Sequence, residues 1–523
     1  MKNVTLDALI PREDFEIIDE LENGNISRNK STLSIEDLTY DSFFFSALRK
    51  PDFQRETNEW NPEKICSFIE SFVKGELVPA IILWKHKNGY IFVIDGSHRL
   101  SALGAWINDD YGDNNISRNY YDKFIPSEQK EIAEYTRKLV NERIGAFKYY
   151  QKARRNPEGV PQYILDNVKN LGAIALQIQW VEGDSATAEK SFLKINQSAT
   201  PISNAELELI KSRKMPYAIA ARAIMRAGKG HNYWSNFNTE TQNKIKKVAR
   251  EIHKLLFSGN SFSETSNLSN LPIGGNFAST STLDLINQTV KISNNINDKT
   301  GNITDEDGSK TLSYLKQTLQ LLQLIHSKEK FSLGLHPFVY FYSNLGKHKI
   351  ASYYGILELF KRLKTQDRIN EFCAVRDRFE EILLKYEFLI QQIVRKWRQS
   401  KRGYKEVADY FEQIIILLNQ KKDASIESIM DDLIKLSKFN YLKLAIIDNT
   451  SNITNRKDFS RGEKVQIKIN ALIKGIPKCP ICNGYIDVNS SSIDHIKRKR
   501  DGGIADISNG QLTHIYCNTT LKN

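Results

Sequence analysis

The residues best suited to hold a metal ion lie near the C-terminal end of the chain. Cys479 and Cys482 form one pair at two-residue separation, and His514 and Cys517 form a second. One pair from a turn and one on a helix can meet to give four tetrahedral ligands, and thiolates with an imidazole suit Zn²⁺. A structural zinc would stabilise a segment that is too short to have much core of its own. The alternative is a set of unrelated buried side chains.

Between the two pairs and directly after the second lie the groups that phosphodiester hydrolysis requires. Asp494 offers a carboxylate oxygen and Asn518 an amide oxygen to a divalent cation. The imidazole of His495 can take a proton from water. A cation held beside it would stabilise the charge that grows on the leaving oxygen. An Asp-His pair alone is weak evidence, so the prediction of a hydrolase rests on the combination.

This arrangement resembles the HNH (ββα-metal) endonuclease family over residues 479–522. The resemblance rests on Cys-x-x-Cys, Asp494-His495, a Gly-Gly pair, Asn509, and a final His-x-x-Cys-Asn with a following Lys. It implies that His495 is the general base, that Asp494 and Asn518 hold one Mg²⁺ or Mn²⁺, and that Asn509 braces the loop carrying His495. The family's second zinc pair is usually Cys-x-x-Cys, and its final position, Asn518 here, is often His.

Four consecutive basic residues follow the Asp-His pair: Lys497, Arg498, Lys499 and Arg500. In a nuclease they would contact the phosphates on either side of the scissile bond, which is a sequence-independent and salt-sensitive interaction. The alternative is a solvated charged turn.

A second polar group lies where the apolar segment 91–94 leads into a predicted helix. Backbone N–H groups at a helix start, together with a guanidinium, can hold a phosphate, and a glycine lets the phosphate approach closely. The residues predicted to bind nucleotide or phosphate are Asp95, Gly96, Ser97, His98, Arg99, Gln54, Arg55 and Asn196. The alternative is that Asp95 caps the helix and pairs with Arg99.

These motifs resemble a ParB-like domain of modification-dependent restriction proteins of the GmrSD and SspE kind, over roughly residues 50–215. Trp60, Val78-Pro79 and the segment Pro-Ile-Ser-Asn-Ala-Glu-Leu from Pro201 belong to the resemblance. It implies nucleotide binding or hydrolysis, or sensing of modified DNA, coupled to an attached nuclease. The motif of these proteins is commonly Asp-Gly-Gln-Gln-Arg, whereas this chain has Asp-Gly-Ser-His-Arg. This difference weakens the expectation of nucleotide hydrolysis more than the expectation of phosphate binding.

The hydrophobic pattern predicts the elements that position these groups. We expect helices at 61–75, 98–109, 185–196 and 203–213, a strand at 177–181, and a β-hairpin over 80–94 that turns at Asn88-Gly89. Residues 258–310 are polar and predict a long loop or partly disordered insertion, whereas 311–440 is helical almost throughout. The polar segment 448–464 is a linker candidate.

The expected fold is multidomain and mainly α with α+β. It comprises an α+β ParB-like domain (1–230), a helical connector (231–450) and a zinc-stapled ββα-metal domain (451–523). Within the connector, residues 394–405 interleave basic and aromatic side chains, including Trp397 and Tyr404. They suit DNA contact, or else form a solvated helix end with its aromatic residues packed inward.

Bulk properties limit the possible partners. The 523 residues carry a formal net charge of +12, which favours a polyanionic partner. No apolar stretch is long enough for a membrane span and none resembles a signal peptide, so we expect a cytoplasmic protein with no membrane partner.

The sequence therefore predicts a phage-defence endonuclease that senses a nucleotide or foreign, modified DNA and cuts with its HNH domain. A single site that cuts both strands would favour a homodimer. Two other functions stay open: a DNA-binding regulator whose zinc-bound tail is catalytically silent, and an NTPase whose tail only docks DNA.

Overall fold

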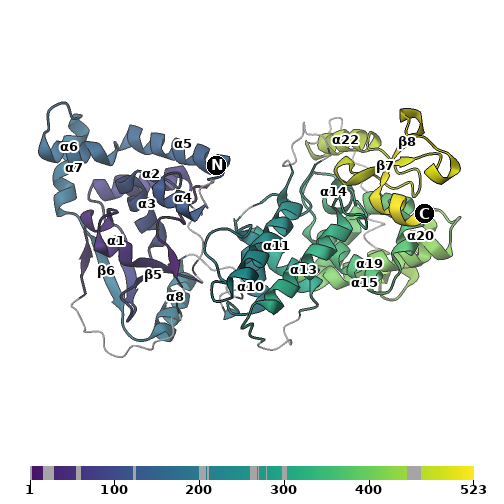
Figure 1. Ribbon diagram of the computed structural model, residues 1–523, viewed down its shortest axis with the longest axis horizontal. Helices are drawn as coiled ribbons and strands as arrows, with labels where there is room; N and C mark the ends of the chain where they lie inside the picture. Colours follow the sequence, from purple (N-terminus) through teal and green to yellow (C-terminus); the bar gives the residue numbers. More distant parts are fainter. Residues whose placement is uncertain are drawn as a thin grey trace. The chain divides into compact units, whose positions relative to one another are not determined.

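The computed structural model describes residues 3–13, 15, 29–52, 54, 60–121, 125–199, 208, 211–259, 268, 270–277, 279–296, 303–443 and 461–522. The chain divides into two compact units (Figure 1). Unit 1 comprises Met1–Arg213 with Lys229–Tyr233, and unit 2 comprises Lys214–Gly228 with Trp234–Asn523. None of the helices in the described ranges combines the length and apolarity that a bilayer crossing needs.

Unit 1 is built on a six-stranded mixed sheet with the order β1-β3-β5-β4-β6-β2. The pairs β1–β3, β3–β5 and β4–β6 are parallel, whereas β4–β5 and β2–β6 are antiparallel. The strands are β1 (Arg12–Glu13), β2 (Thr32–Leu33), β3 (Leu48–Pro51), β4 (Ile81–Lys85), β5 (Ile91–Asp95) and β6 (Leu176–Val181).

The predicted hairpin over 80–94 is confirmed as the β4–β5 pair. Gly89 has φ 92°, the positive value that its tight turn requires. Both faces of β5 are buried, because Val93 packs in one apolar cluster and Phe92 and Ile94 pack in another. The strand thus ends in a covered position, and Asp95 is its last residue.

Helices cover this sheet. Asn61 caps α2 by accepting a hydrogen bond from the Lys64 amide at 2.9 Å, and Pro62 begins this helix, which confirms the helix predicted at 61–75. The predicted strand at 177–181 and the helices at 98–109 and 185–196 are confirmed as β6, α3 and α8. The helical elements of unit 1 are η1 (Glu36–Leu38), α1 (Phe43–Ala47), α2 (Pro62–Val73), α3 (Ser97–Asn108), α4 (Asn115–Tyr120), α5 (Ser127–Arg143), α6 (Phe147–Arg155), α7 (Gln162–Ala173) and α8 (Ser185–Ala199).

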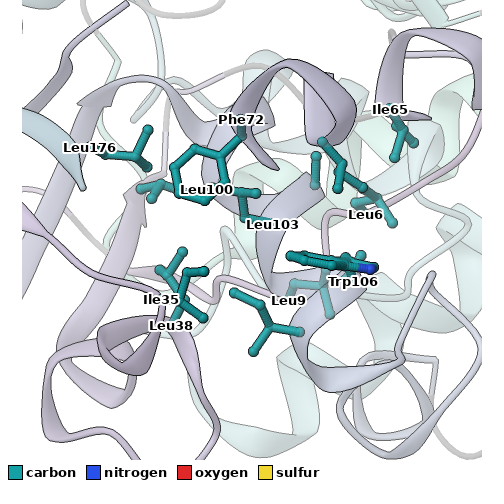
Figure 2. Close-up of a cluster of buried hydrophobic side chains, with 14 of the residues drawn as sticks. Leu6, Leu9, Ile35, Leu38, Ile65, Phe72, Leu100, Leu103, Trp106 and Leu176 are labelled. Carbon is teal, nitrogen blue, oxygen red and sulfur yellow. The ribbon is translucent and has the colours of Figure 1, made fainter. Parts of the chain in front are cut away.

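The larger core of unit 1 surrounds α3, whose residues are buried almost throughout. Leu100 and Leu103 lie among side chains from α2, from η1 and from the N-terminal segment (Figure 2). Trp106 closes the cluster, and its indole N–H donates to the Gly145 carbonyl at 2.9 Å. This packing fixes the start of α3, where the predicted phosphate-binding residues lie.

Unit 2 is helical up to its last segment, and α15 and α19 pack side by side in it. Its helices are α10 (Pro216–Met225), α11 (Thr239–Phe257), α12 (Ser279–Ser293), α13 (Ser309–Ile325), α14 (Pro337–Phe341), α15 (Ile350–Thr365), α16 (Ile369–Cys373), α17 (Arg376–Lys385), α18 (Glu387–Trp397), α19 (Ser400–Gln420), α20 (Ile426–Lys435), η2 (Asn440–Leu442) and α22 (Arg461–Lys474).

One expectation for this region is wrong. Residues 279–293 form α12, although the polar composition of 258–310 predicts a long loop there. Leu285, Ile286 and Val290 recur at helical spacing and are buried, so a few apolar positions are enough to hold a helix in a polar segment. The expected helix at 203–213 and the linker candidate at 448–464 lie largely outside the described residues.

The C-terminal segment forms a short hairpin followed by a helical turn. Its elements are η3 (Val488–Ser490), β7 (Ser491–His495), η4 (Lys499–Asp501), η5 (Ile507–Asn509), β8 (Gly510–His514) and the π-helical turn η6 (Cys517–Leu521). Strands β7 and β8 are antiparallel. The segment lies in the same compact unit as the helices of 234–443, and the three-domain division expected from the sequence stays a prediction.

Candidate active site and metal centre

The four predicted zinc ligands come together. The ligating atoms of Cys479, Cys482, His514 and Cys517 all lie within 4.8 Å of one another. His514 Nδ1 is 3.3 Å from Cys482 Sγ and 3.8 Å from Cys517 Sγ. Zinc–ligand bonds of about 2.0 to 2.3 Å put tetrahedral neighbours at about these separations, so the donor set and its spacing suit Zn²⁺.

Local structure explains how each ligand is placed. Cys479 and Cys482 lie in a tight turn, in which Asn483 donates its amide to the Cys479 carbonyl at 2.7 Å and takes φ 53°. His514 ends β8 rather than lying on a helix as expected, and Cys517 begins η6. The other nitrogen of His514, Nε2, is 3.0 Å from the Tyr485 carbonyl, which orients Nδ1 toward the sulfur atoms.

The apolar support around this cluster is small. Ile486 is buried beside the cysteines, and Ile481, Leu512 and Leu521 pack against them as partly buried side chains. A core of this size contributes little stability, which agrees with a structural role for a bound metal.

Asp494, His495 and Asn518 line one cavity of about 390 Å³, whereas Asn509, the fourth residue of the predicted catalytic group, is not among its lining residues. Asp494 and His495 end β7, where they pair with Gln511 and Gly510 of β8. Asn518 reaches the same cavity from η6. The lining residues are Ile493, Asp494, His495, Arg498, Lys499, Arg500, Asn518 and Lys522.

Asp494 is buried, and its side chain is 7% exposed. Its Oδ2 accepts hydrogen bonds from Gln511 Nε2 at 2.8 Å and from Lys522 Nζ at 2.5 Å. Burial opposes ionisation, but the hydrogen bonds from Lys522 and Gln511 and the Lys522 charge outweigh it and lower the pKa of Asp494. The carboxylate is therefore anionic near neutral pH, as a cation ligand must be.

The two asparagines have different surroundings. Asn509 accepts from the Lys497 amide at 2.7 Å and donates to the carbonyls of Lys497 and Ile504 at 3.2 and 2.8 Å. These bonds close the loop that follows His495. Asn518 donates to Ser492 Oγ at 3.2 Å, which ties the start of η6 to β7.

The predicted DNA-contacting residues divide into two groups. Arg498, Lys499 and Arg500 line the cavity beside Asp494 and His495. Lys497 is not among the lining residues, although its backbone is held by Asn509 on both its amide and its carbonyl side. The cavity therefore combines one buried carboxylate with an excess of cationic groups, which suits a phosphate-bearing ligand.

A contact that sequence reasoning missed fixes this segment to the helices of unit 2. Arg376 and Glu380 of α17 form a buried ion pair at 2.8 Å. Glu380 accepts the Tyr485 amide at 2.7 Å, while Arg376 donates to the Leu333 and Gly334 carbonyls at 2.8 and 3.3 Å. An Arg and a Glu four residues apart in a helix ordinarily predict an exposed pair, so the sequence gives no signal of this interface.

The loop between α13 and α14 supports both halves of the cavity. Asp487 Oδ2, just before η3, is 2.9 Å from His326 Nε2. Ser490, the residue before β7, donates to the Ser327 carbonyl. On the other side, Thr519 of η6 donates to the Lys330 carbonyl at 2.7 Å. The strand that carries Asp494 and the turn that carries Asn518 are thus anchored to one loop.

In unit 1 the predicted phosphate-binding residues gather only in part. Arg99 pairs with Asp95 at 2.5 Å, which is the contact of the alternative interpretation, although no side chain caps α3. Gly96 has φ 97°, and a Cβ there would lie 2.5 Å from Ile81 and 3.2 Å from Arg99, so only glycine fits.

The remaining predicted residues of this group lie around the same strand end. Gln54 donates to the Val93 carbonyl at 3.2 Å, Ser97 is buried, and His98 stacks on Trp60 with ring centroids 5.6 Å apart. Arg55 and the side chain of Asn196 lie outside the described residues. Whether these groups bind a ligand stays a prediction.

A buried charged cluster in unit 1 was not found from the sequence. Asp7 accepts Arg12 Nη2 at 2.8 Å and Lys50 Nζ at 2.9 Å, and all three side chains are almost fully buried. Arg12 also donates to the Gln54 carbonyl at 2.5 Å, which links the cluster to a predicted phosphate-binding residue. Asp7 and Arg12 are five residues apart, whereas Lys50 lies 43 residues from Asp7, and the three match no short motif.

The basic and aromatic segment 394–405 ends α18 and begins α19. Lys396 Nζ lies 3.7 Å from the ring centroid of Tyr441, and Lys401 pairs with Asp284. Trp397 remains 40% exposed. Part of the segment is thus engaged within unit 2, and its contact with DNA stays a prediction.

A comparison with known protein families matches residues 35–213 to the GmrSD restriction endonuclease N-terminal domain and residues 479–523 to the HNH endonuclease. Comparisons with curated proteins and with solved structures found no match. The resemblances to the GmrSD N-terminal domain and to the HNH endonuclease are therefore confirmed, whereas the ParB-like character of the first domain stays a prediction. The two matched segments support a restriction-type nuclease, and they imply DNA as the substrate and a divalent metal.

Proposed function

We propose that this pairing of domains is a metal-dependent DNA endonuclease of a phage-defence restriction system, in which the N-terminal unit senses a nucleotide or foreign, modified DNA. The observation that carries the proposal is that Asp494, His495 and Asn518 line a single cavity with four lysine and arginine residues. The cavity holds a candidate base, two oxygen ligands and the cationic groups that a phosphodiester requires.

In the proposed reaction His495 takes a proton from a water molecule that attacks the scissile phosphorus in line. Asn509 acts through the loop, because its three hydrogen bonds fix the backbone that follows His495. Asp494 and Asn518 would hold a Mg²⁺ or Mn²⁺ ion, which would neutralise charge on the departing 3′ oxygen. Lys522 and Gln511 keep Asp494 anionic and fix its orientation.

The basic residues would supply binding rather than chemistry. Arg498, Lys499 and Arg500 lie at the cavity, and Lys497 precedes them in the same loop. Their contacts with phosphates on either side of the scissile bond carry no sequence information, so selection of the target falls to another part of the chain.

We assign that selection to unit 1. Its Asp95, Gly96 and Arg99 lie where a buried strand meets the start of α3, and Gly96 takes the positive φ at this turn with the Arg99 guanidinium close beside it. Such a strand end suits the phosphate of a nucleotide or of DNA. Because Arg99 is paired with Asp95, we expect a phosphate to compete with Asp95 for the guanidinium.

Cleavage of supercoiled plasmid tests the nuclease assignment. Wild-type protein with Mg²⁺ or Mn²⁺ should nick or linearise plain, glucosylated or phosphorothioated DNA, with or without nucleoside triphosphate. His495→Ala should reduce cleavage by at least about a hundredfold, which is the lower range for loss of a general base, while DNA binding stays unchanged. Ile507→Ala is the matched control, because Ile507 lies in the loop after His495, is 98% exposed and does not line the cavity.

Other outcomes would point elsewhere. Cleavage by His495→Ala at the wild-type rate would remove His495 as the base. Tight binding with no cleavage of any DNA would favour a regulator with a catalytically silent tail. Nucleotide turnover that survives Asp494→Ala, without strand breaks, would favour an NTPase.

A further inference from the structure

Lys522 lies in the cavity, where the proposed reaction uses it only to keep Asp494 anionic and oriented. Its Nζ donates to Asp494 Oδ2 at 2.5 Å and also to the His495 carbonyl. The side chain is only 17% exposed, so it is directed inward rather than toward solvent. One ammonium group therefore contacts both members of the Asp-His pair.

The zinc ligand Cys517 fixes the position of this lysine. Cys517 begins η6, and the amide of Lys522 donates to the Cys517 carbonyl at 3.1 Å, closing the π-helical turn. Asn518 is tied to β7 on the same turn. Single π-helical turns often occur at functional sites, because the wider turn redirects a side chain. Here it brings Lys522 to the same carboxylate that would bind a cation.

Two donors of different charge share one oxygen of that carboxylate. Gln511 Nε2 donates to Asp494 Oδ2 at 2.8 Å and is neutral, whereas Lys522 is cationic. A divalent ion on Asp494 would sit beside this ammonium and close to Arg498, so like-charge repulsion would weaken its binding. A phosphate entering the cavity would attract the ammonium and offset that repulsion.

We propose that Lys522 makes binding of the divalent ion depend on DNA, by pairing with Asp494 until a DNA phosphate competes for its ammonium. The proposal rests on the proposed nuclease function of this cavity and assigns Lys522 as a positioning residue of it. Linkage requires the converse effect as well, so the ion should strengthen DNA binding by the same factor.

Titration with Mn²⁺ tests this in zinc-loaded full-length protein carrying His495→Ala, with and without saturating 20-base-pair duplex. In this parent the duplex should tighten Mn²⁺ binding about tenfold, a typical coupling between two sites. Adding Lys522→Met should tighten Mn²⁺ binding about tenfold without DNA and remove most of the duplex effect. Lys522→Arg keeps the charge and should behave like the parent.

Gln511→Leu is the matched control, because it removes the neutral donor to the same oxygen and leaves the ammonium in place. It should not tighten Mn²⁺ binding. An unchanged Mn²⁺ affinity in Lys522→Met, with zinc content and circular dichroism equal to the parent, would overturn the proposal. If Lys522→Met loses zinc, Lys522→Gln serves as the second neutral variant.

These readouts are separate from cleavage. If wild-type protein cuts none of the DNAs while Mn²⁺ and duplex still strengthen each other's binding, the nuclease assignment fails and the role of Lys522 stands. If the protein cuts but the duplex leaves Mn²⁺ affinity unchanged, the role of Lys522 fails alone.

Discussion

Asp494 and His495 are neighbours on one strand, yet their side chains have different surroundings. Asp494 is buried and accepts two hydrogen bonds on one oxygen, whereas His495 is half-buried at the cavity. Successive residues of a strand point to opposite faces, and the end of β7 lets both reach the cavity. The first residue is therefore held as a fixed anion, and the second remains accessible to solvent, as the base of a hydrolase must be.

Other histidines in unit 2 are held neutral by burial and should make the fold sensitive to acid. His348 contacts the rings of Tyr342 and Tyr353, and its Nε2 is 2.9 Å from the Ile273 carbonyl. Burial lowers the pKa of His348 to about 4; the hydrogen bond to Ile273 opposes the shift and the Lys349 charge adds to it. Since an unfolded histidine has a pKa of about 6.5, only the unfolded chain gains the proton as pH falls from 6.5 to 4.

We therefore expect the free energy of unfolding to decrease as the pH falls from about 6.5 to about 4. His348 should contribute up to roughly 3 kcal/mol of this loss. His348→Gln, which keeps a donor for Ile273, should reduce that part of the loss. Urea denaturation of unit 2 at several pH values measures it. If the free energy of unfolding falls with pH in parallel for the variant and the wild type, His348 is not the source of the acid sensitivity.

At the scale of elements, the nuclease segment is joined to the helices by α17. Arg376 and Glu380 are buried together, and Glu380 also accepts the Tyr340 hydroxyl at 2.7 Å and the Tyr485 amide at 2.7 Å. Replacing Arg376 with methionine would leave a buried, unpaired carboxylate, a change that typically costs about 3 to 5 kcal/mol.

We expect Arg376→Met to destabilise unit 2 by that amount in urea denaturation and to lower cleavage, because the segment around Tyr485 loosens. Adding Glu380→Gln should recover part of the stability, since the unpaired charge is then removed. Arg402→Met, at an exposed arginine of α19, is the control and should change stability by less than about 0.5 kcal/mol. Equal effects at Arg376 and Arg402 would show that the ion pair does not stabilise the interface.

The elements also show what could be predicted from the sequence. The β4–β5 hairpin, the helix α2 and the clustering of the four predicted zinc ligands are encoded by neighbouring residues or by short spacings, and these predictions are confirmed. The helix α12 was missed because its polar residues mask a few apolar positions that only tertiary packing reveals. The contact of Glu380 with Tyr485 joins residues 105 positions apart, and no local pattern encodes it.

At the scale of the whole molecule, the net charge of +12 favours a polyanionic binding partner and says little about the fold. DNA binding releases counterions in proportion to the phosphates that are neutralised, so affinity should fall steeply with salt. Arg498 and Arg500 lie at the cavity, where they can each neutralise a phosphate. Their contribution should therefore appear in the salt dependence of binding even though the rest of the chain also carries positive charge.

We expect the double variant Arg498→Gln, Arg500→Gln to reduce the slope of log K against log salt by about 2, because each arginine would neutralise one phosphate. Fluorescence anisotropy with a labelled duplex, in the non-cutting His495→Ala protein, measures this slope between about 50 and 200 mM salt. Lys364→Gln, at an exposed position near the end of α15, is the control and should leave the slope unchanged. If both changes alter the slope equally, binding follows overall charge and the loop after His495 does not contact DNA. A reduced slope confined to the arginine variant, by the same amount for every duplex sequence, instead places phosphate contact at the cavity and leaves recognition of the target to unit 1.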